Sequence, residues 1–222
     1  MSPVDLRLYG ILDTGRLGGD PVRLADLARA AVRGGCTLLQ LRDKSADIRA
    51  LVARARVLAT AELGVPVLVN DRVDVALAAG ADGVHLGQDD MLPADARRLL
   101  GPRAIIGLTL KNAAQADALY REAVDYGCVG GVFATGSKDN PDPPVGLAGL
   151  SRILFRARLA RGAGFPVGAI AGIDADNAPG VVGAGADGVA VIASLFLGPD
   201  VEAAARRLRP AVDGALAARG AT

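Results

Sequence analysis

The three lysines of this 222-residue chain, Lys44, Lys111 and Lys138, each follow a strand-like apolar run. All other basic side chains are arginines. Lysines spread over the surface as solvated charge would fall mostly on helices, so this placement indicates a mouth where phosphates or other anions bind. Chance clustering of a rare residue type is the alternative interpretation.

Gln40, Arg42 and Lys44 stand at the end of the second such run, where Gln40 and Arg42 share one face of the predicted strand. A buried strand gives a guanidinium access to solvent only at its end, so Arg42 is expected to point into the mouth. A forked donor beside an ammonium group suits a diphosphate. An ion pair between Arg42 and Asp43 is the structural alternative.

Acidic side chains follow the next two runs, with Asn70 and Asp71 after the third and Asp89 and Asp90 after the fourth. Neighbouring acidic loops can converge on one divalent cation, and Mg²⁺ takes carboxylate and substrate phosphate oxygens. Spacing alone leaves two alternatives open. Asp71 could cap a helix over 72–79, and Asp89 or Asp90 could be a solvated turn residue.

The single histidine, His85, lies inside the fourth run between Gly83 and Gly87. A lone histidine in a barrel strand is more often a hydrogen-bonded interior residue than a catalyst. With one histidine and no nearby cysteine, the sequence argues against a histidine-based zinc site.

Hydroxyl and glycine residues follow the last three runs. Thr135, Ser137 and Lys138 come after the sixth, and Gly172 and Ser194 lie at the ends of the seventh and eighth. Barrels often bind a phosphomonoester with backbone N–H groups at their last two loops. Gly172 would permit the close backbone approach of such a site, and a glycine required for packing alone is the alternative. Two anion sites on one face would take two phosphorylated substrates or one bisphosphate.

Eight short and almost wholly apolar runs predict the strands that position these residues. They are 9–12, 37–42, 66–70, 83–87, 104–110, 128–133, 167–173 and 188–193. Continuous apolar character is typical of parallel strands buried on both faces. Amphipathic segments at 21–33, 46–63 and 201–217 predict helices, with Asp20 and Asp200 suited to cap the first and last. The alternation predicts one α/β domain over 1–222, a single (βα)8 TIM barrel with phosphate-binding loops at its C-terminal face.

The sequence GADGV occurs at 80–84 and again at 185–189. This spacing is close to half the chain and fits two four-unit halves, although convergence on one αβ turn would explain it equally well. Asp82 and Asp187 precede their strands, so they are expected to be structural residues at the barrel bottom. The proline-rich segment 140–144 is typical of a semi-rigid loop or lid at the mouth, not of a domain boundary.

The composition excludes several classes of protein. A formal net charge of +1 argues against nucleic-acid binding, and four phenylalanines, three tyrosines and no tryptophan offer no platform for stacking bases. No run approaches the ~18 apolar residues of a membrane span, and 1–8 lack the apolar core of a signal peptide. Cys36 and Cys128 are expected to be reduced core residues of a cytoplasmic protein. The oligomeric state, a homo-oligomer included, stays open.

Several motifs together resemble the thiamine-phosphate synthase family. They are QLRDK at 40–44, VND at 69–71, GADGVHLGQDD at 80–90, GLT at 107–109, TGSK at 135–138 and GADGVAV at 185–191. They stand in the family's order over nearly the whole chain, and together they are highly specific. The resemblance implies an enzyme that joins 4-amino-2-methyl-5-hydroxymethylpyrimidine diphosphate to a hydroxyethylthiazole phosphate, or its carboxylate form. The products would be thiamine phosphate and pyrophosphate, with Mg²⁺ required.

The same resemblance implies roles for individual residues. The pyrimidine diphosphate would be bound by Gln40, Arg42, Lys44, Asn70, Thr109 and Lys138, with Thr109 in place of the family's common serine. Catalysis would involve Arg42, Lys44 and Lys138, and Mg²⁺ would be ligated by Asp71 and Asp90. The thiazole phosphate would be contacted by Thr135 and Ser137 and by backbone groups of Gly172, Ile192 and Ala193.

The family's chemistry agrees with the side chains present. The pyrimidine diphosphate ionises first, the electron-rich aminopyrimidine stabilises the cation, and the thiazole nitrogen captures it. Such a step needs no protein nucleophile, only stabilisation of the departing pyrophosphate. The chain departs from the family pattern at Ala171, where glycine is usual, and at Ala193, where serine is common. Lys111 and the 140–144 loop are also less usual, and their roles stay open.

Three other functions fit the residues less well. A thiazole tautomerase-like barrel would not need Arg42, Lys44, Asp71, Asp90 and Lys138 together. A sugar-phosphate isomerase or epimerase would need a general acid–base pair facing across the mouth. A thiamine-related sensor would bind the product without turnover, and the intact cationic and acidic groups argue against it.

Overall fold

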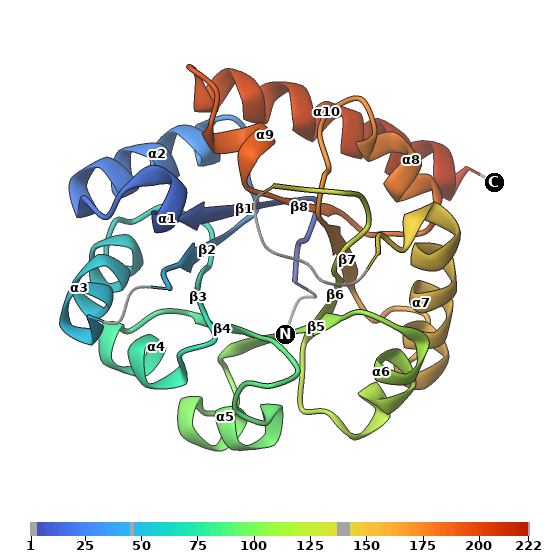
Figure 1. Cartoon of the computed structure of the whole chain (residues 1–222), viewed down its shortest axis with the longest axis horizontal. Coiled ribbons are helices and arrows are strands. Elements are labelled where there is room, and N and C mark those ends of the chain that lie inside the picture. Colours follow the sequence, from blue (N-terminus) through green and yellow to red (C-terminus); the bar gives the residue numbers. More distant parts are fainter. Residues whose placement is uncertain (1–3, 45–46, 137–142, 222) are drawn as a thin grey trace.

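Eight parallel strands pair in sequence order, and the last closes onto the first to form a barrel (Figure 1). The computed structural model describes residues 4–44, 47–136 and 143–221. The strands are β1 Leu8–Asp13, β2 Leu38–Arg42, β3 Val67–Asn70, β4 Gly83–Leu86, β5 Ile105–Leu110, β6 Tyr126–Val129, β7 Val167–Ile170 and β8 Val189–Val191. The predicted (βα)8 fold is confirmed.

Helices surround the barrel on its outer side (Figure 1). They are α1 Thr14–Leu17, α2 Pro21–Arg33, α3 Ile48–Ala59, α4 Val73–Ala79, α5 Pro93–Leu100, α6 Ala113–Ala118, the short 3₁₀ helix η1 Leu119–Arg121, α7 Gly146–Arg161, α8 Ala178–Gly183, α9 Ala193–Phe196 and α10 Val201–Gly220. Asp20 caps α2 by accepting from the backbone N–H of Val22 at 2.8 Å, and Asp200 caps α10. Both caps match the sequence prediction.

Several predicted boundaries are wrong in the same direction. The run 128–133 was expected to be a strand, but β6 starts at Tyr126 and ends at Val129. The seventh and eighth strands likewise end earlier, at Ile170 and Val191. In each case the apolar sequence continues past the last residue of the strand. Val132 remains in the core there, whereas Gly131, Gly172 and Ile192 line the pocket. The predicted helix 46–63 is shorter, since α3 begins after Asp47, which caps it, and ends at Ala59.

At the barrel bottom, a polar side chain hydrogen-bonds the start of one strand to the turn that enters the next. A polar residue one or two positions before each even-numbered strand accepts a hydrogen bond from a backbone N–H at the start of the preceding strand. The pairs are Thr37 with Leu8 at 3.1 Å, Asp82 with Val67 at 2.8 Å, Asp125 with Ile106 at 2.7 Å and Asp187 with Val167 at 2.9 Å. The backbone N–H of the same polar residue bonds the partner's carbonyl oxygen in all four. These reciprocal pairs satisfy backbone groups at the strand starts and fix the register there.

The repeated GADGV sequence follows from this geometry. Asp82 and Asp187 make the same bond, as predicted for structural residues. The next residue in each copy must be glycine, because a Cβ on Gly83 would lie 1.9 Å from the carbonyl oxygen of Ile105, and a Cβ on Gly188 would lie 1.7 Å from that of Leu6. One αβ turn used twice therefore accounts for the repeat, whatever its evolutionary origin.

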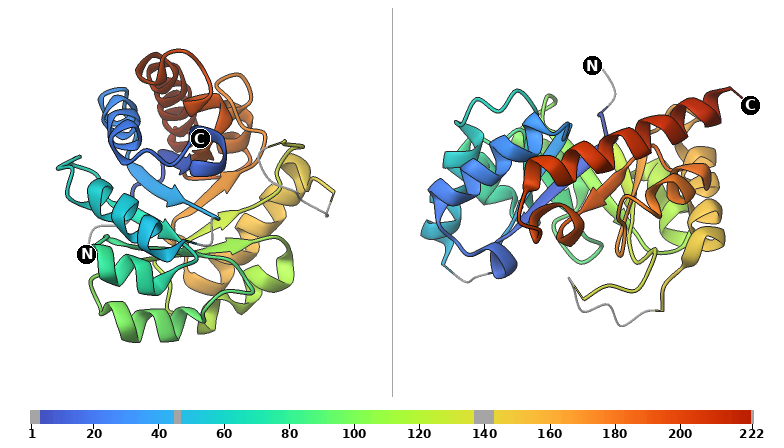
Figure 2. Two further views of the ribbon diagram at one scale, coloured as in Figure 1. Left: turned by 60° about the vertical axis from the view of Figure 1, so that its left-hand side comes forward. Right: turned by 90° about the horizontal axis from the view of Figure 1, so that it is seen from above.

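The interior of the barrel forms its own cluster of buried side chains, separate from the larger core between strands and helices. It contains Leu6, Tyr9, Ile11, Leu38, Leu68, Tyr126, Cys128, Ala190 and Ile192. Both cysteines are buried free thiols. Residues 4–7 lie at one end of the barrel and 131–136 at the other, which is the mouth (Figure 2). In the described part of the chain, no helix is both long and apolar enough to cross a membrane.

Candidate active site

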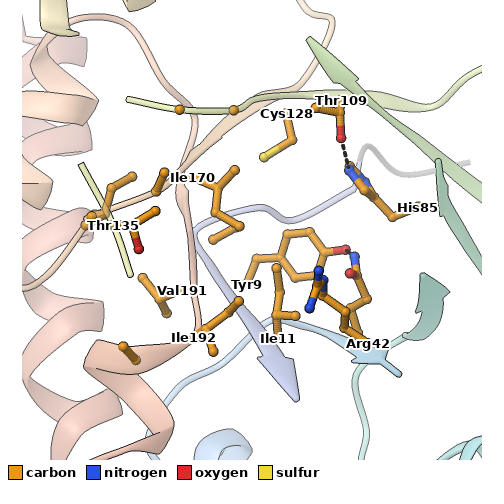
Figure 3. A pocket seen from close by; sticks show the side chains of 18 of the residues that line it. Tyr9, Ile11, Arg42, His85, Thr109, Cys128, Thr135, Ile170, Val191 and Ile192 are labelled. Atoms are coloured by element: carbon orange, nitrogen blue, oxygen red, sulfur yellow. Dashed lines mark hydrogen bonds between the residues drawn. The ribbon is translucent and has the colours of Figure 1, made fainter. Parts of the chain in front are cut away.

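A pocket opens at the C-terminal ends of the strands, where the fold predicts the chemistry to lie. Its polar lining comprises Gln40, Arg42, Asn70, His85, Thr109, Lys111, Thr135 and Ser194. Its apolar walls comprise Tyr9, Ile11, Cys128, Ile170, Val191 and Ile192, whose side chains surround the cavity in Figure 3. Gly130, Gly131, Ala171, Gly172, Ile173, Ala190 and Ala193 complete it. Residues from distant parts of the sequence thus share one apolar cavity with few polar groups, as ligand pockets do.

Arg42 is held at the mouth by Asp13, the last residue of β1. One guanidinium nitrogen of Arg42 donates to the Asp13 carboxylate, whose other oxygen accepts from the backbone N–H of Gly15 at 2.9 Å. Asp13 is therefore fixed at both oxygens. The alternative pairing of Arg42 with Asp43 is wrong, since Asp43 pairs with Arg54 at 2.7 Å on the outer side.

Lys44, Asp71 and Asp90 form a second charged cluster beside the pocket. The Lys44 ammonium contacts Asp71, and Asp90 accepts from the backbone N–H of Gly87 at 2.7 Å. Burial alone raises the pKa of the Asp71 carboxyl, but hydrogen bonds from Lys44 and Asp90 outweigh burial and place that pKa below its ordinary value. The pKa of Asp90 is raised by burial and then by the neighbouring Asp71 carboxylate. The two carboxyl groups therefore lie close enough to shift each other's pKa in opposite directions.

The backbone at Asp71 is unusual for a non-glycine residue. Its φ of 62° lies in the left-handed region, and its N–H bonds the His85 carbonyl oxygen at 2.9 Å. Such strain is typical of functional positions. The alternative role of Asp71 as a helix cap is wrong, because α4 begins at Val73 after Arg72 and has no side-chain cap.

The two neighbouring carboxylates suit a hard divalent cation. Within residues 4–44, 47–136 and 143–221, no group of three or more His, Cys, Asp or Glu side chains could hold a metal. Mg²⁺ does not require one, because it binds through one or two carboxylates, water and substrate phosphate. The Asp71–Asp90 pair offers the two carboxyl groups that such a site needs.

A chain of polar side chains crosses the interior below the mouth. Gln40 donates through Nε2 to the phenol oxygen of Tyr9, which lies 3.1 Å from that of Tyr126. The Tyr126 oxygen lies 2.8 Å from Nδ1 of His85, and His85 Nε2 lies 2.9 Å from Oγ1 of Thr109 (Figure 3). His85 is thus both a hydrogen-bonded interior residue, as expected, and part of the pocket wall.

The loops after the last three strands meet on the opposite side of the pocket. Gly172 has a φ of 65°, and a Cβ there would lie 2.5 Å from the carbonyl oxygen of Ala134. Close approach of these two loops therefore requires glycine, and it brings Thr135 into the lining. Ile192 and Ala193 stand where the short helix α9 begins, and the first N–H groups of a helix have no partner within it.

Comparison with known proteins agrees with this geometry. The family model described as "Thiamine monophosphate synthase" matches residues 8–195. The chain belongs to this family. A protein of Agrobacterium fabrum named "Thiamine-phosphate synthase" is 50% identical over 222 residues, covering 99% of both chains. One of Moorella thermoacetica with the same name is 43% identical over 207 residues, covering 92% of this chain and 95% of its own.

A solved structure gives the same result at the level of the fold. "Thiamine phosphate pyrophosphorylase" of Pyrococcus furiosus superposes with a TM-score of 0.81 at 35% identity, covering 96% of this chain and 98% of its own. The thiamine monophosphate synthase family thus accounts for the whole barrel.

Two of the site residues expected for this family, Ser137 and Lys138, lie outside the described residues, as does most of the 140–144 loop. Gln40, Arg42, Asn70, Thr109, Thr135, Gly172, Ile192 and Ala193 line the pocket. Lys44, Asp71 and Asp90 are not part of its lining and cluster next to it. Lys111, whose role the sequence left open, lines it as well.

Sequence reasoning missed Asp13, Tyr9 and Tyr126. Asp13 directly follows the predicted strand 9–12, so its place at a strand end is the signal that marks it. Tyr9 and Tyr126 stand among apolar neighbours in their strands. Their polar contacts arise only when β1 and β6 face each other across the barrel, so no local pattern marks them.

Proposed function

We propose that this chain is a transferase that makes thiamine phosphate. It would move the aminopyrimidinylmethyl group from its diphosphate to the nitrogen of a hydroxyethylthiazole phosphate and release pyrophosphate. Full-length similarity to proteins named for this activity, together with one pocket that has cationic and neutral anion-binding sides, carries the proposal.

The aminopyrimidine end would be recognised deep in the pocket by Gln40. Nε2 of Gln40 donates to Tyr9, so its carbonyl oxygen is the atom suited to accept from a 4-amino group. Asn70 lines the wall beside it. The flat ring would lie against apolar side chains such as Ile11 and Cys128.

The diphosphate would extend toward the mouth, where Arg42, Lys44 and Thr109 can donate hydrogen bonds to it. Asp13 fixes the direction of the Arg42 fork, so little reorganisation is needed when charge develops. Lys138 would add a third cation. Asp71 and Asp90 would hold Mg²⁺, which when bound neutralises charge on the departing pyrophosphate.

Bond cleavage and capture need no proton transfer. The bond between the methylene carbon and the diphosphate oxygen breaks, and both electrons leave with pyrophosphate. The thiazole nitrogen then gives its lone pair to the methylene carbon and becomes the thiazolium of the product. The walls formed by Ile170, Val191 and Ile192 would exclude water, which otherwise competes for the cation.

The thiazole phosphate would be held on the neutral side of the mouth. Thr135 and backbone groups of Gly172, Ile192 and Ala193 are suited to its phosphate oxygens, with Ser137 as a further donor. The carboxylated thiazole is an alternative form of this substrate.

The decisive experiment mixes purified protein with pyrimidine diphosphate, thiazole phosphate and Mg²⁺ and measures pyrophosphate release. We expect release that depends on both substrates, with thiamine phosphate formed. Tight binding of a thiazole phosphate without release would instead favour a tautomerase-like barrel or a thiamine-related sensor.

The metal site is tested by Asp71→Asn and Asp90→Asn, with the exposed neighbour Asp89→Asn as the matched control. Each test variant should lose Mg²⁺-dependent turnover by about 10²-fold or more, whereas the control keeps it. Normal Mg²⁺ dependence in both test variants would remove the pair from the metal site.

The role of Lys138 is tested by Lys138→Ala, which should weaken diphosphate binding or lower turnover. Unchanged affinity and turnover would exclude this residue from the site.

A further inference from the structure

Asp43 stands between Arg42 and Lys44, two of the cations proposed to bind the diphosphate, yet it is not part of the pocket lining. The Asp43 side chain is 1% exposed, and its Oδ2 accepts from Nη1 of Arg54 at 2.7 Å. β2 and its ladder with β1 end at Arg42, so Lys44 lies two residues past the last ladder pair. The buried carboxylate therefore fixes the backbone directly before Lys44.

The helix that carries Arg54 is itself held in place. α3 packs Leu51, Ala55 and Leu58 into the core, and each of these side chains is buried. The Arg54 side chain is 20% exposed, so its guanidinium lies mostly between protein groups. An anchor on a packed helix gives the loop that it contacts a fixed position.

A second bond holds the Arg54 guanidinium in one orientation. Its Nε donates at 2.7 Å to the carbonyl oxygen of Gly19, in the connection between α1 and α2. A Cβ on Gly19 would lie 2.4 Å from a guanidinium nitrogen, so this close contact requires a residue without a side chain. α2 and α3 pack side by side outside β1 and β2, which brings Gly19 and Arg54 together (Figure 1).

The two cations thus have separate anchors. Arg42 is held inside the barrel by Asp13. The Lys44 side chain is 57% exposed, so little packing holds it, and the reach of its ammonium group depends on where the backbone places it. That backbone is fixed from the outer side of the barrel by the Asp43–Arg54 pair.

Stability alone is a weak reason for this arrangement. Replacing a buried ion pair with apolar side chains of similar volume is often neutral or stabilising, so a pair kept for stability has no need of charge. Gly19 does not have a positive φ, so its backbone would accept alanine, which would stabilise the fold if Arg54 did not need the space.

We propose that Arg54 is a positioning residue of the diphosphate site. Through Asp43 it fixes the backbone before Lys44, and this placement lets the Lys44 ammonium reach the mouth beside Asp71. Arg54 acts through Lys44 and not by contact with the substrate. Diphosphate as the anion rests on the proposed function, whereas the anchoring of the Lys44 segment to α3 does not.

Gly19→Ala tests the anchor without changing any charge. The added Cβ must displace the guanidinium of Arg54, and no backbone strain accompanies it. We expect kcat/KM for the pyrimidine diphosphate to fall about five- to tenfold, because Lys44 is no longer held where it meets the anion. KM for thiazole phosphate should change by less than about twofold, because that phosphate is proposed to bind at the loops after β6, β7 and β8. Gly198→Ala is the matched control, since an added Cβ there meets no described atom within 4 Å.

The pair itself should give the same result. Arg54→Met alone leaves Asp43 buried without its arginine and should lower Tm by roughly 6–20 °C. The kinetic test therefore uses Arg54→Met together with Asp43→Asn, at a temperature well below the Tm of this double variant. It should show the same selective loss toward the pyrimidine diphosphate as Gly19→Ala. Arg56→Met is its control, because the exposed Arg56 lies on the same helix and donates to a different carbonyl oxygen, that of Ala78.

A double-mutant cycle tests whether Arg54 acts through Lys44. In a Lys44→Ala background, Gly19→Ala should lower kcat/KM for the pyrimidine diphosphate by less than about twofold further. A loss in that background as large as in the wild type overturns the proposal. So does an unchanged kcat/KM in Gly19→Ala, or a matching rise in KM for thiazole phosphate.

If the wild-type protein shows no turnover, binding of inorganic pyrophosphate in the presence of Mg²⁺ replaces kcat/KM as the readout. Weaker binding by Gly19→Ala and by the double variant of Arg54 and Asp43, but not by the two controls, supports the positioning role even though the proposed function has failed. Equal binding by all the proteins overturns it. A wild-type protein that binds no pyrophosphate also overturns it, because Lys44 would then face no diphosphate site.

Discussion

The buried carboxylate of Asp13 provides a direct test of how the mouth orients Arg42. We predict that Asp13→Asn lowers both stability and turnover. The variant keeps the volume of the side chain and an oxygen that can accept from the Gly15 N–H. It removes the charge, and it replaces the oxygen that accepts from Arg42 with an amide N–H₂ that cannot accept.

The magnitude follows from the exposure of the pair. The Asp13 side chain is 5% exposed and that of Arg42 is 18% exposed, so solvent replaces little of the lost bond. A hydrogen bond to a charged group contributes about 1.5–3 kcal/mol, and partial access of Arg42 to the pocket places the loss near 2 kcal/mol. For a domain of this size that corresponds to a fall in Tm of roughly 4–8 °C. Asp13→Ala should lose about 1 kcal/mol more, because it also removes the cap of α1.

The assay combines thermal unfolding with pyrophosphate release. We expect kcat/KM for the pyrimidine diphosphate to fall about 10- to 100-fold in Asp13→Asn, since the Arg42 fork is no longer held in one direction. The control is Asp26→Asn, which breaks an exposed pair with Arg29 and should cost less than about 0.5 kcal/mol. If Asp13→Asn melts like the control and keeps its kcat/KM, Asp13 does not position Arg42.

Three further predictions follow from the backbone and the buried thiols. Burial raises the pKa of both Cys36 and Cys128 to about 12, so a disulfide reagent should label neither thiol at pH 8 until the protein unfolds. These thiols ionise at a lower pH in the unfolded chain than in the fold, so the free energy of unfolding should fall as the pH rises from 9.0 toward 12. Rapid labelling of the native protein would contradict both expectations. Ala171→Gly should stabilise the protein by about 1 kcal/mol in denaturant unfolding, because Ala171 has a φ of 98°, and a loss of stability would show that its backbone is not strained. Gly172→Ala should destabilise by about 2–3 kcal/mol and weaken thiazole phosphate binding, and a neutral result would show that the two loops can separate at little cost.

The sequence was sufficient for the barrel because its parallel strands are buried on both faces. That burial makes each strand a continuous apolar run, and caps such as Asp20 before Pro21 mark helix starts locally. The same continuous apolar character made the ends of the strands hard to predict. Val132 and Phe133 are apolar because they pack against the core, yet β6 has already ended at Val129.

The fold brings the ends of the strands together, and this is why several of the predicted site residues line one pocket. A polar residue at the end of a strand can reach the mouth, so Gln40 and Thr135 could be placed there from position alone, whereas Thr109 was expected there only from the family resemblance. The pairing of polar groups could not be predicted. The sequence offered Asp43 as the alternative partner of Arg42, whereas the observed partner, Asp13, is 29 residues away on an adjacent strand.

The four reciprocal bonds at the barrel bottom group the eight strands into four pairs. A break in the chain within a pair and a break between two pairs should therefore have different consequences. Thr37, Asp82, Asp125 and Asp187 each tie an even strand to the strand before it, and in each case the tie lies in the turn that enters the even strand. A circular permutant opened in such a turn loses both hydrogen bonds of that tie, one to a side-chain oxygen and one between backbone groups. One opened before β3, β5 or β7 leaves all four ties intact. The barrel thus consists of four strand pairs, and the turns before β3, β5 and β7 connect one pair to the next. These three turns lie at the barrel bottom, on the face away from the substrates.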